Sequence, residues 1–390
     1  MSILLNEQQE NAVLEALKWF KNKTKQVFEI SGPAGSGKTT IVKQIVERLG
    51  LYEDQVVFCA FVGKAAMQLN RSGVKAKTIH STIYDMEDVP VLDENGKIIL
   101  KNNRPVTRLA FIKKEELSPN IKLIVVDEGS MIDNKIAGDL KSFGIPILVL
   151  GDLNQLPPVF GNPAFLSRPD VVLTKIMRQN KDSKIIEFSQ KAINGEPMDY
   201  GIYGDDVMVI RKDQITDTII QKSDIVICAK NSTRDKLNKY IREDVYGIHE
   251  KYPVRGEKLI CRQNNWRRSI CDDIFLINGL IGYVDNVSYE TFNGKSIEID
   301  FRPEFLEYDY FKRLNLDYNY LFMNHEERSK VKRSFFTKLE FGYVITCHLS
   351  QGSQYETVLV IDENVGTYDY HRKWLYTAIT RASKKLILAI

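Results

Sequence analysis

The stretch from Gly32 to Thr39 constrains this chain most, because it matches the pattern G-x-x-x-x-G-K-[ST] in full. The apolar run Val27–Ile30 before it reads as a buried strand, and Thr40–Leu49 after it reads as an amphipathic helix that ends at Gly50. In this context the glycines let backbone N–H groups surround phosphate oxygens at a helix N-terminus, where the dipole favours negative charge. A glycine-rich turn with a chance Lys-Thr is the competing interpretation, which the flanking elements disfavour. The pattern predicts a site for ATP or GTP.

Two side chains of this loop have predicted chemical roles. Lys38 would reach the β- and γ-phosphates, and the Thr39 hydroxyl would bind Mg²⁺. The residues expected to contact the nucleotide are those of the loop and the first helical turn: Gly32, Pro33, Ala34, Gly35, Ser36, Gly37, Lys38, Thr39 and Thr40.

The bulk composition narrows the class of protein. A chain of 390 residues predicts two or three domains, and 43% apolar with 27% charged residues is typical of a soluble globular protein. No apolar run reaches the length of a membrane span, and the first residues lack the pattern of a signal peptide. The five cysteines are scattered without C-x-x-C pairs, which disfavours zinc and disulfides. We therefore expect a cytoplasmic protein.

Apolar runs bounded by turn residues recur in both halves of the chain, with helical patterns between some of them. This alternation predicts parallel sheets covered by helices, hence an α/β fold with two cores. Only the first half carries a phosphate loop, so we expect ATP between the cores, with the second core supplying groups to it. The expected strands are Val27–Ile30, Val56–Ala60, Leu123–Val126, Ile147–Leu150, Ile225–Ala229, Tyr343–Cys347, Val358–Ile361 and Leu386–Ile390, and the expected later helices are Thr233–Glu243 and His371–Ala382.

Three segments depart from the α/β pattern. Val89–Leu100 reads as two short strands around Asn95-Gly96, a strong hairpin signal. Tyr283–Phe301 alternates around a second Asn-Gly and predicts a small β element. The aromatic residues of Phe305–Phe322 read as the core of a small insertion in preference to a base-stacking surface.

Two further segments carry polar residues at strand ends. Asp127 and Glu128 follow a buried strand, at the sheet edge where α/β proteins bind ligands. Asp127 suits Mg²⁺ binding, and Glu128 suits activation of the water that attacks the γ-phosphate. Helix capping is the competing role for this pair. Gln155 follows another strand and precedes a Pro-Pro turn, where it could respond to the γ-phosphate.

With these segments included, the chain resembles superfamily 1 helicases of the 5′-to-3′ branch, the group containing RecD and Dda. The resemblance covers Leu5 to the C-terminus, and its motifs occur in the family's order. Besides the phosphate loop and Asp127-Glu128, they are Leu5–Gln9, Phe61–Ala66, Lys77–Ser81, Gly151–Pro158, Ile176–Gln179, Thr346–Gln354 and Leu375–Ala382.

The resemblance implies roles for single residues. Gln9 would contact adenine, Gln354 a ribose hydroxyl, and Arg178 and Arg381 the γ-phosphate, where cations stabilise the charge of phosphoryl transfer. For His80 and His348, a buried core role remains an equal alternative. Gly129 stands where the family has Ala, which we expect to matter little. The residues implied to contact DNA are Lys64, Thr78, His80, Ser81, Thr346, His348 and Ser350.

The resemblance also implies the architecture and activity. We expect RecA-like cores over 1–178 and 179–390, with a strand-splitting hairpin near 88–108 and a β-rich accessory insertion near 267–337. The implied activity is ATP- and Mg²⁺-dependent movement of a monomer 5′ to 3′ on single-stranded DNA, with unwinding of tailed duplexes. The resemblance further implies a phage-encoded or bacterial protein, with other replication or recombination proteins as partners. One alternative is an RNA-directed motor of the same superfamily. The other is a nucleotide-gated binding module, and the catalytic carboxylates and arginines disfavour this second alternative.

Overall fold

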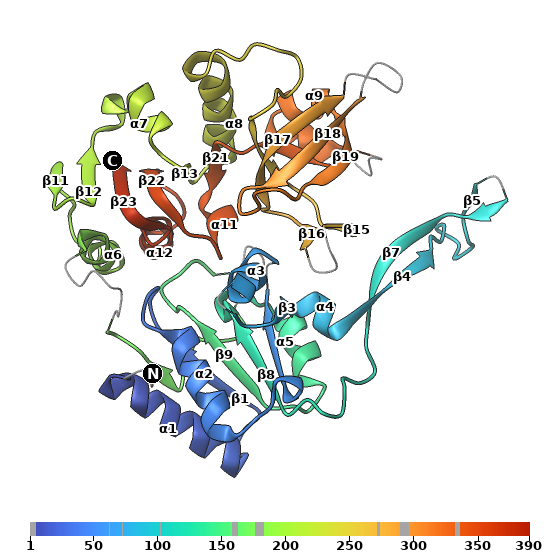
Figure 1. Cartoon of the computed structure of the whole chain (residues 1–390), viewed down its shortest axis with the longest axis vertical. Coiled ribbons are helices and arrows are strands. Elements are labelled where there is room, and N and C mark those ends of the chain that lie inside the picture. The colour runs from blue at the N-terminus through green and yellow to red at the C-terminus, as the bar shows by residue number, and fades with distance from the viewer. Residues whose placement is uncertain are drawn as a thin grey trace. The chain divides into compact units, whose positions relative to one another are not determined.

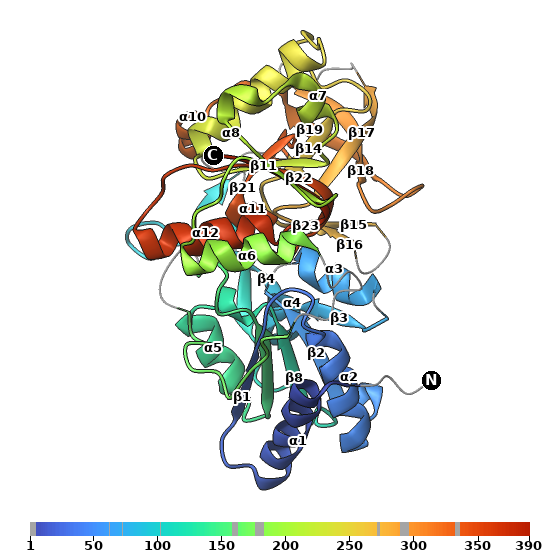
Figure 2. The ribbon, with the colours of Figure 1, turned by 90° about the vertical axis from the view of Figure 1, so that its left-hand side faces the viewer.

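The computed structural model describes residues 5–61, 63–71, 73–101, 103–157, 163–175, 183–270, 274–288, 296–331 and 336–390. The chain forms two compact units (Figures 1 and 2). The first comprises Met1–Leu153 and Pro157–Arg178, and the second comprises Asn154–Leu156 and Gln179–Ile390. Among the described residues, no helix is both long and apolar enough to cross a lipid bilayer.

The first unit is built on a six-stranded parallel sheet of order β10-β1-β9-β8-β2-β3. Successive side chains of a strand face opposite sides. In β8, Leu123 and Val125 pack with α1 and α2, whereas Ile124 and Val126 pack with α4 and α5. Both faces are therefore covered, which explains the continuous apolar runs. The elements are β1 (Val27–Ser31), β2 (Val56–Ala60), β3 (Ala76–Thr78), β8 (Leu123–Asp127), β9 (Ile147–Gly151), β10 (Val171–Val172), α1 (Glu7–Asn22), α2 (Lys38–Leu49), α3 (Gly63–Arg71), α4 (Ile79–Ile83) and α5 (Asn134–Lys141).

A β-ribbon projects from the first unit (Figure 1). Its antiparallel strands β4 (Tyr84–Pro90) and β7 (Thr107–Lys113) pair along their whole length. The tip between them contains β5 (Leu100–Lys101), β6 (Arg104–Pro105) and a tight turn. In that turn Gly96 has a φ of 77°, a backbone conformation that suits glycine. The expected Asn95-Gly96 turn is thus present, but it closes only the tip of a longer ribbon.

The second unit contains a six-stranded sheet of order β11-β12-β23-β22-β13-β21, parallel except for the β11–β12 pair. Helices α6 and α12 lie side by side on one face (Figures 1 and 2), and α7 and α8 contribute to the other. The helix expected over His371–Ala382 ends at Ile379, because Ala382 begins β23. The elements are β11 (Gly201–Tyr203), β12 (Val207–Ile210), β13 (Ile225–Cys228), β21 (Val344–Thr346), β22 (Tyr355–Ile361), β23 (Ala382–Ala389), α6 (Lys184–Asn194), α7 (Asp217–Gln221), α8 (Asn231–Tyr240), α11 (Cys347–Ser350) and α12 (Tyr368–Ile379).

An accessory antiparallel sheet of order β19-β18-β17-β14-β20 is inserted in the second unit. It begins earlier and ends later than the insertion expected near 267–337. Phe311 and Tyr320 are buried, in line with the core role expected for this aromatic segment, while Tyr308 is 80% exposed. The elements are β14 (Lys258–Cys261), β15 (Asn265–Ile270), β16 (Ile274–Leu276), β17 (Ile281–Ser288), β18 (Ser296–Pro303), β19 (Phe311–Asp317), β20 (Leu339–Phe341), α9 (Tyr318–Phe322) and α10 (His325–Lys330).

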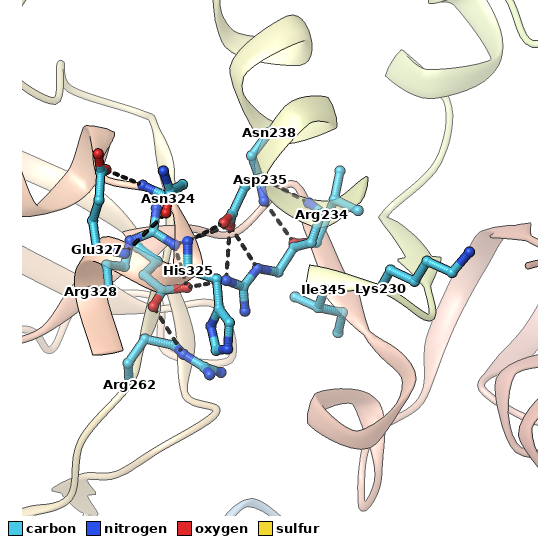
Figure 3. A network of polar contacts seen from close by, with 12 residues as sticks. Lys230, Arg234, Asp235, Asn238, Arg262, Asn324, His325, Glu327, Arg328 and Ile345 are labelled. Atoms are coloured by element: carbon cyan, nitrogen blue, oxygen red, sulfur yellow. Dashed lines mark hydrogen bonds and ion pairs between the residues drawn. The ribbon is translucent and has the colours of Figure 1, made fainter. Parts of the chain in front are cut away.

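A buried network of ion pairs joins α8 to this accessory sheet (Figure 3). The Glu340 carboxylate lies 3.3 Å from nitrogens of Arg234, Arg262 and Arg328. Asp235 accepts hydrogen bonds from Arg234 at 2.8 Å and Arg328 at 3.0 Å. Three guanidinium groups therefore share two carboxylates, and burial together with the neighbouring arginines lowers the pKa of Arg262.

We expect the Glu340→Gln substitution to lower the free energy of unfolding of the second unit by about 3–5 kcal/mol, because it leaves buried guanidinium charges uncompensated. Urea denaturation would measure the change. The matched control is Glu298→Gln in β18, which removes the exposed pair with Arg313 and should cost less than about 1 kcal/mol. Equal effects of the two substitutions would contradict a structural role for the network.

Candidate nucleotide and nucleic-acid sites

The phosphate loop connects β1 to α2 at the carboxyl edge of the first sheet. Gly35 and Gly37 have φ values of 82° and 84°, which residues with a side chain rarely adopt. The Lys38 ammonium donates hydrogen bonds to the carbonyl oxygens of Gly32 at 2.6 Å and Pro33 at 3.1 Å. Thr39 and Thr40 follow in the first turn of α2. The loop thus has the curled backbone and inward-facing ammonium that phosphate binding requires.

Gln9 supports this loop from α1. Its Nε2 donates to the Ser36 carbonyl at 3.0 Å, and its Oε1 accepts from the Asn6 N–H at 3.0 Å. The second bond is part of the capping box at the start of α1, in which Asn6 is the N-cap. A Cβ on Gly37 would lie 2.5 Å from Gln9 Nε2, so this contact requires glycine. Gln9 is buried. The structure gives it a supporting role under the loop, and its contact with adenine stays a prediction.

The two predicted catalytic carboxylates follow β8. Asp127 accepts a hydrogen bond from the Glu128 N–H at 2.9 Å. Burial raises the pKa of Asp127, although the nearby Lys38 charge and the Glu128 N–H oppose that rise. Because β1 and β8 flank β9 in the parallel sheet, Asp127 lies at the same carboxyl edge as the phosphate loop. Glu128 has φ 54° and ψ 41°, an unusual conformation for a residue with a side chain, and such strain is concentrated at functional sites.

Oxygen donors of this edge suit magnesium. Mg²⁺ prefers hard oxygen ligands and usually binds through one or two protein groups together with substrate phosphates. The Thr39 hydroxyl and the Asp127 carboxylate are donors of that kind. A cation would also oppose the rise in the pKa of Asp127 that burial causes. The residues therefore fit Mg²⁺ by their chemistry.

Gly129 fills a place in which a larger residue would collide with β9. A Cβ at this position would lie 2.3 Å from Val149 Cγ1 and 3.2 Å from the Leu150 carbonyl oxygen. Packing against β9 therefore favours glycine at this position, and our expectation that its departure from the family's Ala matters little for the motif stays a prediction. The consequence reaches the site because Gly129 directly follows Glu128.

We expect Gly129→Ala to destabilise the first unit by about 1–3 kcal/mol, the usual effect of overpacking in a dense core. The double substitution Gly129→Ala with Val149→Ala makes room for the new methyl group and should recover part of the loss. Thermal unfolding of the three variants would measure this. If Gly129→Ala alone were as stable as the wild type, β9 would have to shift at little cost to make room for the methyl group.

The predicted DNA contacts of the first unit surround α4. Thr78 caps this helix by accepting the Ser81 N–H at 3.1 Å, and its hydroxyl lies 3.0 Å from that of Ser81. His80 packs against aromatic rings of the ribbon and of the β2 loop, and burial lowers its pKa. Its ring neighbours are Phe61, Tyr84 and Phe111. Lys64 lies in the first turn of α3. Contacts of these residues with DNA remain predictions.

Candidates in the second unit differ in exposure. Ser350 is completely buried and donates to the Cys347 carbonyl at 2.7 Å, which gives its side chain a structural role. Thr346 precedes α11 and is also buried. His348 lies 3.3 Å from the Tyr370 hydroxyl, and burial lowers its pKa. Gln354 is exposed.

Arg381 is held inside the second unit with 3% of its surface exposed. Its guanidinium donates to the carbonyl oxygens of Thr377 at 3.0 Å and Ser353 at 3.1 Å, and to the Thr380 hydroxyl at 3.2 Å. Arg178, its predicted partner in catalysis, lies outside the described residues.

Gln155 belongs by packing to the second unit, although sequence places it after β9 of the first. The next residue, Leu156, is bound through its backbone to Thr377 and Gln351. Gln155 is itself buried, and among the described residues its Oε1 has no hydrogen-bond donor. No local sequence pattern marks Thr377 or Gln351 for this role, because each binds a backbone group far away in the sequence.

Comparisons with known proteins agree with this architecture. The sequence model of the AAA domain matches residues 4–213, and that of the UvrD-like helicase C-terminal domain matches 341–389. The ATP-dependent DNA helicase dda of Enterobacteria phage T4 is 29% identical over 66% of this chain and 61% of its own length. The ATP-dependent RecD2 DNA helicase of Deinococcus radiodurans is 24% identical over 92% of this chain and 46% of its own. The chain thus spans only about half of these relatives.

Solved structures share the fold. Bacteroides Pif1 bound to single-stranded DNA has a TM-score of 0.56 and 18% identity, and the alignment covers 100% of this chain and 93% of that one. Pif1 helicase from Candida albicans also has a TM-score of 0.56, at 17% identity, with coverage of 100% and 94%.

A phosphate loop between a buried strand and a helix, together with the AAA match over more than half of the chain, defines a P-loop protein of the AAA domain family. The UvrD-like C-terminal match and the RecD2 and Dda relatives make the chain similar to superfamily 1 helicases of the RecD-like and Dda-like branch, as the resemblance of its motifs predicted.

Proposed function

We propose that this protein hydrolyses ATP to move 5′ to 3′ along single-stranded DNA and to unwind duplex ahead of it. One observation carries the proposal above all. The phosphate loop with Lys38 follows β1, and Asp127 and Glu128 follow β8 at the same carboxyl edge of the parallel sheet. This is a phosphate cradle beside a pair of carboxylates. The DNA substrate is supported by the similarity to the DNA helicases RecD2 and Dda, and the polarity by the resemblance of the motifs to the 5′-to-3′ branch.

Each residue of the site has a distinct task in this proposal. The loop N–H groups and Lys38 bind the phosphates, and Glu128 accepts a proton from the attacking water. Bound Mg²⁺, held by Thr39 and Asp127, would offset negative charge on the phosphates. Arg381 stabilises the charge of the transferring phosphoryl group. Arg178 is proposed for the same role by resemblance.

Phosphate release with and without single-stranded DNA tests this function, and unwinding of duplexes with a 5′ tail, a 3′ tail or neither tests polarity. We expect slow hydrolysis alone, strong stimulation by DNA, and weaker DNA affinity at higher salt because phosphate contacts release counterions. Hydrolysis indifferent to nucleic acid would support a nucleotide-gated binding module. Stronger stimulation by RNA than by DNA would favour an RNA-directed motor, since contacts to the 2′-hydroxyl distinguish the two strands.

A further inference from the structure

The segment Asn154–Leu156 is held to the rest of the second unit by a clamp of two side chains. The Leu156 N–H donates to the Thr377 hydroxyl at 2.9 Å, and the Leu156 carbonyl accepts from Gln351 Nε2 at 3.1 Å. Leu156, Thr377 and Gln351 are all buried. Both backbone groups of one residue are therefore fixed, which leaves this short stretch little freedom to move apart from α12.

Thr377 also holds Arg381 by a different atom. Its hydroxyl accepts from Leu156 and donates to the Lys373 carbonyl at 2.7 Å, while its own carbonyl accepts from Arg381 Nε at 3.0 Å. Thr377 of α12 thus binds the segment that carries Gln155, and it also binds Arg381, the arginine predicted to reach the γ-phosphate.

We propose that Thr377 is a positioning residue that fixes Gln155 and Arg381 to one helix, so that both groups approach or leave the γ-phosphate as one body. The proposal rests on the proposed ATP hydrolysis and adds the coupling of its two phosphate-facing groups. The presence or absence of the γ-phosphate at Gln155 then acts directly on the second unit, although Gln155 follows β9 of the first unit in the sequence. Gln351 contributes by binding the opposite side of the same peptide.

The Thr377→Val substitution separates the two contacts. Valine has nearly the shape of threonine but lacks the hydroxyl, so the buried Leu156 N–H loses its acceptor, whereas the backbone carbonyl that holds Arg381 stays. A buried donor without an acceptor is costly, so the segment should detach. Thr377→Ser keeps the hydroxyl and should restore the wild-type behaviour.

Steady-state ATPase kinetics with saturating single-stranded DNA test the proposal. We expect kcat of Thr377→Val to fall by about tenfold, with KM for ATP changed less than about twofold, because the lost interaction matters in the transition state. If Thr377 acts through Gln155, adding Thr377→Val to Gln155→Ala should change kcat by less than about twofold. Gln351→Met removes the donor to the Leu156 carbonyl and should behave like Thr377→Val, both in the wild type and in Gln155→Ala. If Thr377→Val folds poorly, Gln351→Met takes its place in the test.

Ser189→Ala is the matched control, because it removes another buried hydroxyl that donates within a helix of the same unit, to the Ile186 carbonyl at 2.7 Å. It should lower thermal stability without lowering kcat. A kcat of Thr377→Val equal to that of Ser189→Ala would overturn the proposal, as would losses that multiply with Gln155→Ala. A wild-type protein without ATPase activity would instead overturn the proposed function itself.

Discussion

Replacing Glu128 by Gln should lower the DNA-stimulated rate of ATP hydrolysis by about 100-fold or more, the usual contribution of a positioned general base. Gln keeps the size and the hydrogen-bonding oxygen of Glu but does not accept a proton at neutral pH. Binding of ATP should persist, because the phosphate contacts come from the loop and Lys38. Single-turnover hydrolysis and equilibrium binding of a fluorescent ATP analogue would measure the two quantities separately.

The structure explains why the effect should be confined to the chemical step. Glu128 occupies a left-handed backbone conformation between the buried end of β8 and the tightly packed Gly129, and that geometry depends on the backbone and not on the carboxylate charge. Lys38→Ala is the contrasting variant, since it should weaken nucleotide binding as well as turnover. Glu47→Gln changes an exposed carboxylate of α2 and should alter neither. Near-normal turnover in Glu128→Gln would direct attention to Asp127, whose pKa burial raises.

Much of the two sheets could be predicted because their strands are buried on both faces. Continuous apolar runs such as Leu123–Val126 and Ile147–Leu150 have few other uses in a soluble protein, and β8 and β9 lie where those runs predicted them. The phosphate loop is equally local, because eight consecutive residues contain its glycines and its lysine.

The full length of the ribbon and the packing of the Gln155 segment could not be predicted, for different reasons. Most of β4 is exposed on both sides, so its sequence lacks the alternation that marks a strand with one buried face. The Leu156 clamp depends on Gln351 and Thr377, which follow it by 195 and 221 residues. Only the folded chain brings them together. The need for glycine at 129 likewise depends on a neighbouring strand.

Removing the tip of the ribbon should strongly slow unwinding while leaving DNA-stimulated ATP hydrolysis near normal. The tip exposes aliphatic side chains, with Leu92 55% and Leu100 60% exposed, and Ile98 and Ile99 beside them. Exposed apolar groups of this density mark contact surfaces. Apolar side chains that insert at base steps can offset an unstacking cost of about a few kcal/mol, so their loss should slow unwinding by about tenfold or more.

The register of the ribbon defines a clean deletion. Pro90 pairs with Thr107, so residues 91–106 can be replaced by Asn-Gly, the sequence preferred in a two-residue hairpin turn. This variant keeps Tyr84 and Phe111 and therefore preserves the aromatic contacts of His80. A second variant, Leu92→Ser with Leu100→Ser, keeps the backbone of the tip and removes much of its apolar surface.

Unwinding of a 5′-tailed duplex, measured beside phosphate release, separates the two functions. If the tip splits base pairs, both variants lose unwinding and keep ATPase activity, because hydrolysis needs only the residues of the sheet edges and Arg381. Retained unwinding in the deletion variant would make the ribbon a surface hairpin, since loops of this kind tolerate change. Strand separation would then depend on another part of the chain, and the accessory sheet of the second unit is the next candidate. Loss of unwinding in the deletion but not in the serine variant would show that the reach of the ribbon matters and its apolar surface does not.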